Sequence, residues 1–375
     1  MLRKRWLLNL LLSLLLLCGC AEPKILDKLG LVTTGAYDLG ENGSILGTAV
    51  ELSIKPNAAN DIDILETHAL TIKGNRNYGN KKASKRLVSG QLRVILYGEE
   101  LLKQGKANVA ETLSSDPSIS DMTYLAVVDG RARDLLQIQN KHIPDIGLHI
   151  YTLMEQNTQN KMMPPATIQE ILRNKYTIGK EPTMPILRKE DSKDVLFSGV
   201  ALFKGSKLVG KINTEQSFYL TLLTDKYKDG SKDVVINSES PKLKGRNQRL
   251  NKTVASLDSI RSSSKIKLIN KDKPEFNIET KFTARLLEIT SPIDVGKPSN
   301  IIFLEKEIEK SMKKEIEKLI SFLQSKNSDV IGLGDIYRSS VRHSKLTDKK
   351  WYKMYKNAKV NVKVDFNIIR TGLND

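Results

Sequence analysis

The two cysteines of the chain, Cys18 and Cys20, are the residues whose spacing predicts a specific reaction. They lie in the segment Leu17-Cys18-Gly19-Cys20, which has the Leu-x-Gly-Cys pattern of a bacterial lipobox. In that chemistry the last thiol forms a thioether to diacylglycerol, and a small residue before it gives the peptidase access to the backbone. The sequence therefore predicts Cys20 as the lipid-attachment residue and the mature N-terminus, held stably on a membrane by its acyl chains.

The residues before the lipobox have the pattern of an export signal. Three basic residues at positions 3–5 precede the apolar run Trp6–Leu17. Twelve helical residues span roughly 18 Å, short of the ~30 Å hydrocarbon core that a transmembrane helix must cross. We expect residues 1–19 to be removed as a signal peptide, which lowers the formal net charge from +17 to +14. A mature chain without a free thiol excludes thiol catalysis and cysteine-ligated zinc.

The sequence predicts no catalytic, cofactor-binding or metal-ligating residue. The histidines show no metal-ligand spacing, and no serine lies in a Gly-x-Ser-x-Gly elbow. Gly332 and Gly334 lack the third glycine of a dinucleotide-binding loop, because Tyr337 stands there, and they follow a predicted helix rather than a strand. We interpret the pair as a turn in which glycine supplies a positive φ or a close approach of chains. The four histidines are His68, His142, His149 and His343.

Basic residues gather in three clusters. They are Lys81, Lys82, Lys85 and Arg86; Lys242, Lys244, Arg246, Arg249 and Lys252; and Lys345, Lys349, Lys350, Lys353, Lys356 and Lys359, the last interleaved with Trp351, Tyr352 and Tyr355. A solvated face and attraction to a membrane surface both explain such clusters. An exported lipoprotein meets anionic phospholipid before it meets DNA, so no nucleic-acid partner is predicted.

Length and composition predict two or three compact domains. The chain has 375 residues, of which 39% are hydrophobic. The first domain, residues 20–188, mixes strands with helices, and residues 179–192 have the proline-containing, charged composition of a linker. Strands are predicted at 45–55, 64–73, 92–97 and 122–128, and helices at 82–90, 99–105, 108–114, 131–139, 146–156 and 167–176.

Two further domains follow in the prediction. A small middle domain, residues 189–252, contains a hairpin at 196–212, a helix at 214–223 and a strand at 234–238. The last domain, residues 253–375, has alternating strands at 276–286 and 360–368 around a long helix with apolar residues about every 3.6 positions from Ile301 to Leu323, capped by Ser299. The fold class is thus α+β, or mixed α/β. It has three domains with mixed and antiparallel sheets, the last a long amphipathic helix packed on an antiparallel sheet.

Read together, the motifs resemble the Ger(x)C family, the C-subunit lipoproteins of spore nutrient germinant receptors. The resemblance covers some 350 residues and rests on the order of its motifs rather than on any single one. One departure is that Ala21-Glu22 follows the lipobox where the family often has Trp-Asp. The motifs are the lipobox with Cys20, 29–32 (LGLV), 92–101 (LRVILYGEEL), 116–130, 199–204 (GVALFK), 207–210 (KLVG), 329–334 (DVIGLG), Trp351 and 360–368.

The resemblance implies a non-enzymatic subunit without a cofactor, anchored by lipid on the outer face of the spore inner membrane. Its implied partners are an A-type and a B-type integral membrane subunit, which together with it form a nutrient receptor. No catalytic residue carries over. We expect the last domain to meet the partners, with its basic aromatic segment near lipid headgroups.

Two other functions fit an exported lipoprotein. One is a membrane-anchored solute-capture lipoprotein of a transporter, which tends to have two similar α/β lobes. The other is a surface-anchored hydrolase acting on the cell wall, for which the sequence offers no candidate residues.

Overall fold

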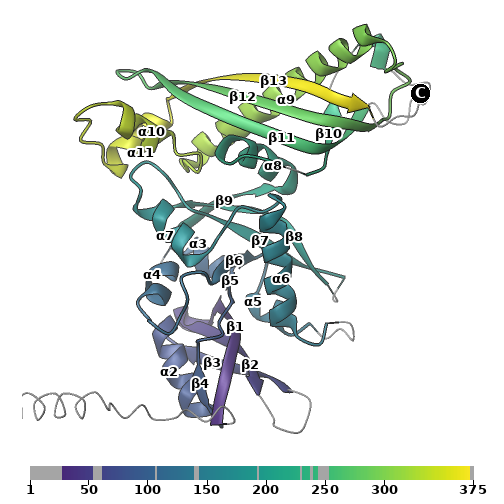
Figure 1. Cartoon of the computed structure of the whole chain (residues 1–375). Helices are drawn as coiled ribbons and strands as arrows, with labels where there is room; N and C mark the ends of the chain where they lie inside the picture. Colours follow the sequence, from purple (N-terminus) through teal and green to yellow (C-terminus); the bar gives the residue numbers. More distant parts are fainter. Residues whose placement is uncertain are drawn as a thin grey trace, which may run out of the picture.

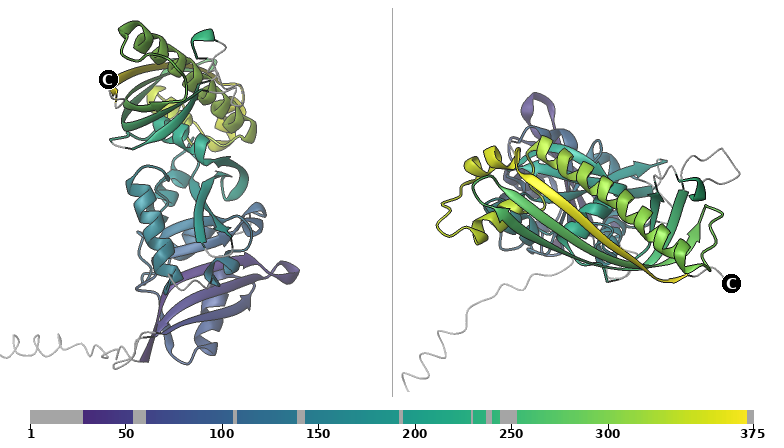
Figure 2. Two further views of the ribbon diagram at one scale, coloured as in Figure 1. Left: turned by 90° about the vertical axis from the view of Figure 1, so that its right-hand side faces the viewer. Right: turned by 90° about the horizontal axis from the view of Figure 1, so that it is seen from above.

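The computed structural model describes residues 28–53, 61–105, 108–138, 143–191, 194–228, 230–236, 240–243 and 253–371. These residues form an elongated molecule in which two β-sheets with their helices follow one another along the long axis (Figure 1). The described chain begins at one end, and the C-terminal sheet lies at the other (Figure 2). The predicted signal peptide and Cys20 lie outside the described residues.

The first sheet has nine strands in the described chain, in the order β3-β2-β1-β5-β6-β7-β8-β9, with β4 pairing beside the start of β1. Its centre, from β1 through β5 and β6 to β7, is parallel, and the pairs on either side are antiparallel. The strands are β1 (Leu29–Leu39), β2 (Ile45–Ser53), β3 (Asp61–Ala69), β4 (Arg86–Val88), β5 (Val94–Gly98), β6 (Tyr124–Val128), β7 (Thr183–Glu190), β8 (Asp194–Lys204) and β9 (Lys207–Asn213).

Helices cover both faces of the first sheet because its central strands are apolar on both sides. Alternate residues of β5 show this, since Ile95 and Tyr97 belong to one buried cluster and Val94 and Leu96 to the other. One face carries α2 (Ile72–Lys82), α3 (Glu99–Lys103), α4 (Val109–Ser114) and α7 (Ile168–Tyr176). The other carries α5 (Ala132–Leu136) and α6 (Ile146–Gln159).

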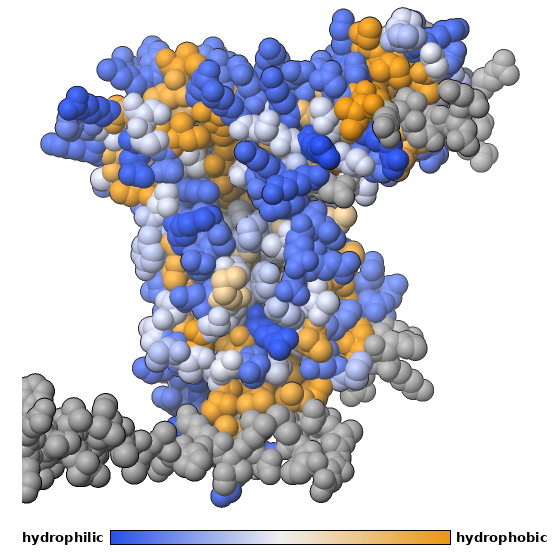
Figure 3. Space-filling model, viewed as in Figure 1, coloured by the Kyte–Doolittle hydropathy of each residue, from blue (hydrophilic) through white to orange (hydrophobic). Residues whose placement is uncertain are grey.

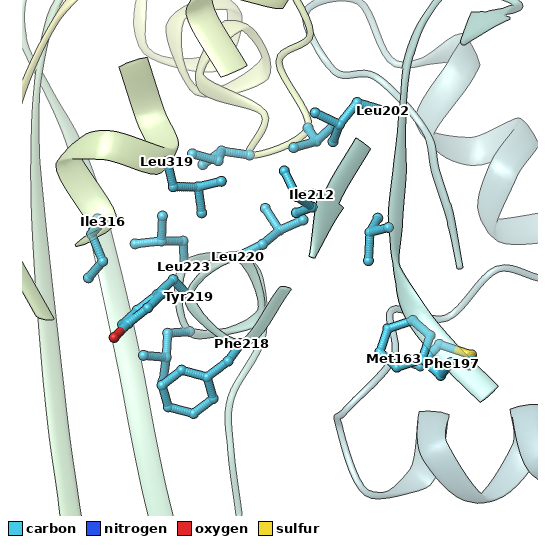
Figure 4. Packing of buried hydrophobic residues seen from close by; sticks show 14 of the residues in the cluster. Met163, Phe197, Leu202, Ile212, Phe218, Tyr219, Leu220, Leu223, Ile316 and Leu319 are labelled. Atoms are coloured by element: carbon cyan, nitrogen blue, oxygen red, sulfur yellow. The ribbon is translucent and has the colours of Figure 1, made fainter. Parts of the chain in front are cut away.

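Helix α8 (Thr214–Thr224) joins the two sheets. It begins with a capping box, in which the Asn213 side chain accepts from the Gln216 amide and the Gln216 side chain accepts from Asn213. Every residue from Ser217 to Leu223 is buried, because β8 and β9 lie on one side of the helix and α9 and β11 lie on the other. Figure 4 shows Leu220 and Leu223 between Ile212 of β9 and Leu319 of α9. One continuous apolar core therefore spans both sheets.

The second sheet has the order β10-β11-β12-β13 and carries the long helix α9. The apolar stripe of α9 is buried as predicted, including Leu304, Ile308 and Leu323. Its elements are β10 (Lys232–Ile236), β11 (Thr253–Asn270), β12 (Glu275–Ile289), α9 (Pro298–Lys326), α10 (Leu333–Ser340), α11 (Asp348–Tyr355) and β13 (Lys359–Thr371). The predicted fold class, α+β with mixed α/β character and a helix packed on the last sheet, is confirmed.

The second sheet is not wholly antiparallel, which corrects the prediction. β10, β11 and β12 pair antiparallel, but β12 and β13 pair parallel along their length. The reason is the connection between them, because a helical crossover returns the chain to the same end of the sheet. The N-cap also differs, since Lys297 occupies it and Pro298, rather than Ser299, begins the helix.

Two local predictions are wrong, and one long strand is missing from the prediction. Residues 82–90 are not a helix; α2 ends at Lys82 and β4 follows. The helix starts earlier because the Thr71 hydroxyl accepts from the Gly74 amide as its N-cap. Residues 179–192 are not a linker, since β7 runs through them with Met184 buried. The long strand β11 is not predicted, because its second half is largely polar and exposed.

The segment 189–252 is shared between the two sheets. The predicted hairpin is confirmed, with Lys204 paired opposite Lys207, but β8 and β9 extend the first sheet, while β10 joins the second. The division into domains at 20–188, 189–252 and 253–375 stays a prediction, because sheet membership does not test which segments fold alone.

The outer edge of the second sheet is closed by two glutamates of α9. The backbone amide of Phe366 donates to Glu309 Oε1 at 2.9 Å, and that of Ile368 donates to Glu305 Oε1 at 2.8 Å. An edge strand with unpaired amides is a template for pairing with another chain. These two carboxylates therefore stabilise β13 and block sheet extension.

Replacing both glutamates by alanine should test this closure. The variant E305A/E309A should lose about 1–3 kcal/mol of unfolding free energy, because two amides lose charged acceptors, and it should self-associate more. Urea unfolding and analytical ultracentrifugation measure the two effects. The exposed Glu317→Ala variant on the same helix is the control, and equal behaviour of the two variants would contradict the role given to the pair.

Candidate functional site

The carboxylate of Asp329 organises the loop between α9 and α10. It is buried, with 1% of its surface exposed. Its Oδ1 accepts from the amides of Gly332 and Leu333, at 2.8 and 3.1 Å, and its Oδ2 accepts from the amide of Gly334 at 2.8 Å and from Trp351 Nε1 at 2.9 Å. Burial raises the pKa of Asp329 to about 6, and the four donors limit that rise. The carboxylate is therefore a structural acceptor, bonded on both oxygens.

Gly332 is the N-cap of α10, and Gly334 is the second residue of that helix. Gly332 has φ +87°, and the backbone of Gly334 touches that of Gly179, which precedes β7. A Cβ on Gly334 would lie 2.5 Å from the Gly179 Cα and 2.6 Å from the Trp351 ring. The predicted positive φ and close approach of chains are confirmed, but the pair begins a helix rather than forming a turn. These glycines do not surround a phosphate site because protein atoms fill the space.

Glu181 holds the first sheet to the same loop. Its amide donates to the Asp329 carbonyl at 2.9 Å, and its carboxylate accepts from the Gly205 amide at 2.8 Å and from the Tyr352 hydroxyl. Burial raises the pKa of Glu181 to about 7, and the charges of Asp348 and Asp329 add to the rise. We call Gly179, Glu181, Asp329, Gly334, Trp351 and Tyr352 the junction.

The aromatic residues of the third basic cluster belong to the junction rather than to a lipid-facing surface. Trp351 and Tyr355 are buried, and the half-buried Tyr352 ring lies under Lys204 Nζ at 4.6 Å. The two buried rings are therefore not available for contact with headgroups, and the expectation that the segment lies near headgroups stays a prediction. The lysines of α11 are exposed at an end of the molecule covered by hydrophilic side chains, opposite the start of β1 (Figures 1 and 3). That the last domain meets the partners stays a prediction.

The remaining predicted positions do not converge. The structure does not describe His142, Cys20 or residues 244–252 of the second basic cluster. His68 lies in β3, His149 in α6 and His343 between α10 and α11. Among the described residues no group of three or more histidines, cysteines or acids is placed to hold a metal ion. No helix in the described ranges is long and apolar enough to cross a membrane.

Sequence reasoning missed Gly179 and Glu181. Their local sequence, Gly-Lys-Glu-Pro, is that of a turn, and their partners lie about 150 residues later in the chain. Because a partner at such a separation leaves no periodic signal, only the folded chain reveals the junction.

Adding one methyl group at Gly334 should test the close approach. Gly334→Ala should cost more than about 2 kcal/mol of unfolding free energy, because two backbones and a buried ring must move. Gly90→Ala is the matched control, since a Cβ there meets nothing within 4 Å, and its effect should lie within about 0.5 kcal/mol of zero. Urea denaturation measures the free energy of unfolding of both variants. A small loss of unfolding free energy in G334A would contradict the packing described.

The buried Glu181 predicts a pH dependence of stability. With a pKa of about 7 in the fold against 4.5 as the ordinary value, the folded chain keeps a proton that the unfolded chain loses between these pH values. The contribution of Glu181 to the free energy of unfolding is thus fully present below pH 4.5. It falls as the pH rises to about 7, by at most about 3 kcal/mol. Glu181→Gln, which mimics the protonated carboxyl, should remove that fall in urea titrations. The exposed Glu190→Gln should retain it.

Two family models match the chain in succession. Residues 22–189 match the spore germination protein N-terminal domain, and residues 198–372 match the C-terminal domain described as spore germination B3/GerAC like. The first match ends within β7 and the second begins within β8, so both sides of the junction fall within them.

Individual relatives agree with the family models. The spore germination protein GerQC of Bacillus cereus is 30% identical over 99% of this chain and 100% of its own length. The putative spore germination protein YfkR of Bacillus subtilis (strain 168) is 20% identical over 94% and 92%. The crystal structure of the GerBC protein shares the fold, with a TM-score of 0.56 at 18% identity over 89% of this chain and 96% of that one. The chain therefore belongs to the Ger(x)C family of spore germination proteins.

Proposed function

We propose that the chain is a lipid-anchored, non-enzymatic subunit of a spore nutrient germinant receptor, required for the germination response to nutrients. It is attached through Cys20 to the outer face of the spore inner membrane and assembles with the A-type and B-type integral membrane subunits. The observation that carries the proposal is the match of two successive family models, which together span nearly the whole chain after the lipobox.

The geometry of the junction supports a scaffolding role. Its polar side chains are bonded to backbone amides or to each other across the two sheets, as with Glu181 and Tyr352. Groups that hold the fold in this way are not available to transfer protons or attack a substrate. The junction instead fixes the direction of the second sheet relative to the first, which suits a subunit that presents surfaces to partners.

The shape of the molecule supports anchoring at one end. β1 begins at Leu29, only nine residues after Cys20, and an extended chain of nine residues reaches at most about 32 Å. The end of the molecule that carries β1 would then face the membrane, and α10 and α11 lie at the opposite end (Figure 1).

Solute capture for a transporter is the less favoured function. Capture proteins tend to have two similar α/β lobes with a site between them. Here a nine-stranded mixed sheet is followed by a four-stranded sheet of different order. The observed architecture therefore favours the receptor subunit.

A single substitution in the lipobox should test the anchor and the function together. Spores with Cys20→Ala should lose most of their germination response to one class of nutrient, because the subunit is no longer held at the membrane. Cys18→Ala is the matched control, since it changes the other cysteine of the same segment and should leave the response intact. Spore optical density after nutrient addition gives the response.

Co-purification from spore membranes completes this test. The wild-type chain should bring down the A-type and B-type subunits, and the C20A chain should bring down much less. Normal germination of C20A spores with every nutrient, in a strain without related receptors, would refute the proposal.

A further inference from the structure

A cleft of about 270 Å³ opens beside the junction, between the first sheet and α8. It lies among α7, the start of β7, α8 and Val330 of the loop that Asp329 organises. Small-molecule sites occur preferentially between packed units, and a volume of this size admits a solute of a few heavy atoms.

Of the charged side chains that line the cleft, four form two ion pairs among the described residues, and Lys180 and Glu181 form none. Lys161 Nζ lies 2.6 Å from Asp225 Oδ2, and Arg173 lies 2.5 Å from Glu170. The Glu181 carboxylate is turned to Tyr352 and Gly205. Within the described residues the Lys180 side chain makes no hydrogen bond and no ion pair, although the carboxylates of Asp335, Glu170 and Asp329 act on it from a longer range.

Lys180 is held in place while its ammonium is left open. Its aliphatic stem passes over Gly332, where a Cβ would lie 3.2 Å from the lysine Cδ. The residue is half-buried, and burial together with the neighbouring Arg173 lowers the pKa of its ammonium, against the opposing effect of the carboxylates of Asp335, Glu170 and Asp329. A partly desolvated cation is stabilised by an anion that enters beside it.

Two further polar side chains around the cleft have hydrogen-bonding groups that face no protein partner among the described residues. The Asn174 amide group and the Thr183 hydroxyl are half-buried, line the cleft and make no side-chain hydrogen bond within the described residues. The hydroxyls of Thr221 and Thr224 differ, because they donate to carbonyls of their own helix. Lys180, Asn174 and Thr183 thus offer a cation and two hydrogen-bonding groups to one small volume.

We propose that this cleft binds a small monocarboxylate, with Lys180 as the counter-ion and Asn174 and Thr183 as hydrogen-bond partners. Lys180 makes no ion pair among the described residues, and one carboxylate would match its single charge. A phosphate, with a charge of about −1.5 to −2 at neutral pH, would need a second cation, and the other two cations of the cleft, Lys161 and Arg173, are already paired with Asp225 and Glu170. The bound solute would contact α7, α8 and the Asp329 loop together and would stabilise the junction.

Equilibrium dialysis with the full chain in detergent tests the proposal. The probes are radiolabelled acetate, glycine and phosphate, each at fixed ionic strength set with chloride. We expect one saturable site for acetate or glycine, weaker binding of phosphate, and a rise in Tm with the bound probe. Absence of saturable acetate and glycine binding up to about 10 mM, or tighter binding of phosphate, would overturn it.

Two variants locate the site. Lys180→Gln should weaken acetate binding about tenfold, and Lys226→Gln, which removes an exposed lysine outside the cleft, should leave it unchanged. If K180Q does not fold, as judged by circular dichroism, Asn174→Ala should weaken binding about threefold. Equal binding by wild type and the folded variant would contradict the assignment.

The inference does not rest on the receptor proposal. A chain that binds acetate in a Lys180-dependent manner while C20A spores germinate normally would support the cleft and refute the receptor. A chain that binds none of the probes while C20A spores fail to germinate would do the opposite.

Discussion

The burial of the Asp329 carboxylate is the constraint on which the arrangement of the molecule depends. A charge removed from water must be matched by donors, and here four donors come from one short loop and one distant indole. These four hydrogen bonds to the carboxylate fix the start of α10 and the position of α11. The backbone carbonyl of the same residue then accepts from Glu181, which brings in the first sheet. A single buried group thereby orients elements that are far apart in the chain.

The apolar core and the polar junction both hold the two sheets together. The central residues of α8, Ser217–Leu223, are buried between the two sheets, so separating the sheets would expose at least one apolar side of the helix to water. The contact of Gly179 with Gly334 lets the two backbones approach more closely than any side chain would permit. The result is a molecule whose parts keep one orientation along a long axis. That property suits a subunit anchored at one end and in contact with partners elsewhere.

Sequence patterns predicted the helices and strands in which buried apolar residues recur at the regular spacing of the element. The stripe from Leu304 to Leu323 and the alternation in β12 and β13 are such cases, because one face of each meets the core. β7 was missed because proline and charged residues dominate its local composition, while its burial comes from neighbours on both sides. The parallel pairing of β13 depends on the crossover connection and leaves no mark in the strand itself.

The sequence by itself predicted the lipobox at Cys20 and the fold class, and it contained no recognisable catalytic motif. The order of its motifs indicated the family. These depend on residue type and local spacing. Only the tertiary structure decided what the glycine pair and Trp351 do, because their partners, Asp329 and Gly179, are defined by packing. It also decided that Trp351 and Tyr355 of the basic segment face inward and that Lys180 makes no ion pair among the described residues. Contacts between distant residues arise from the whole fold, and no local pattern encodes them.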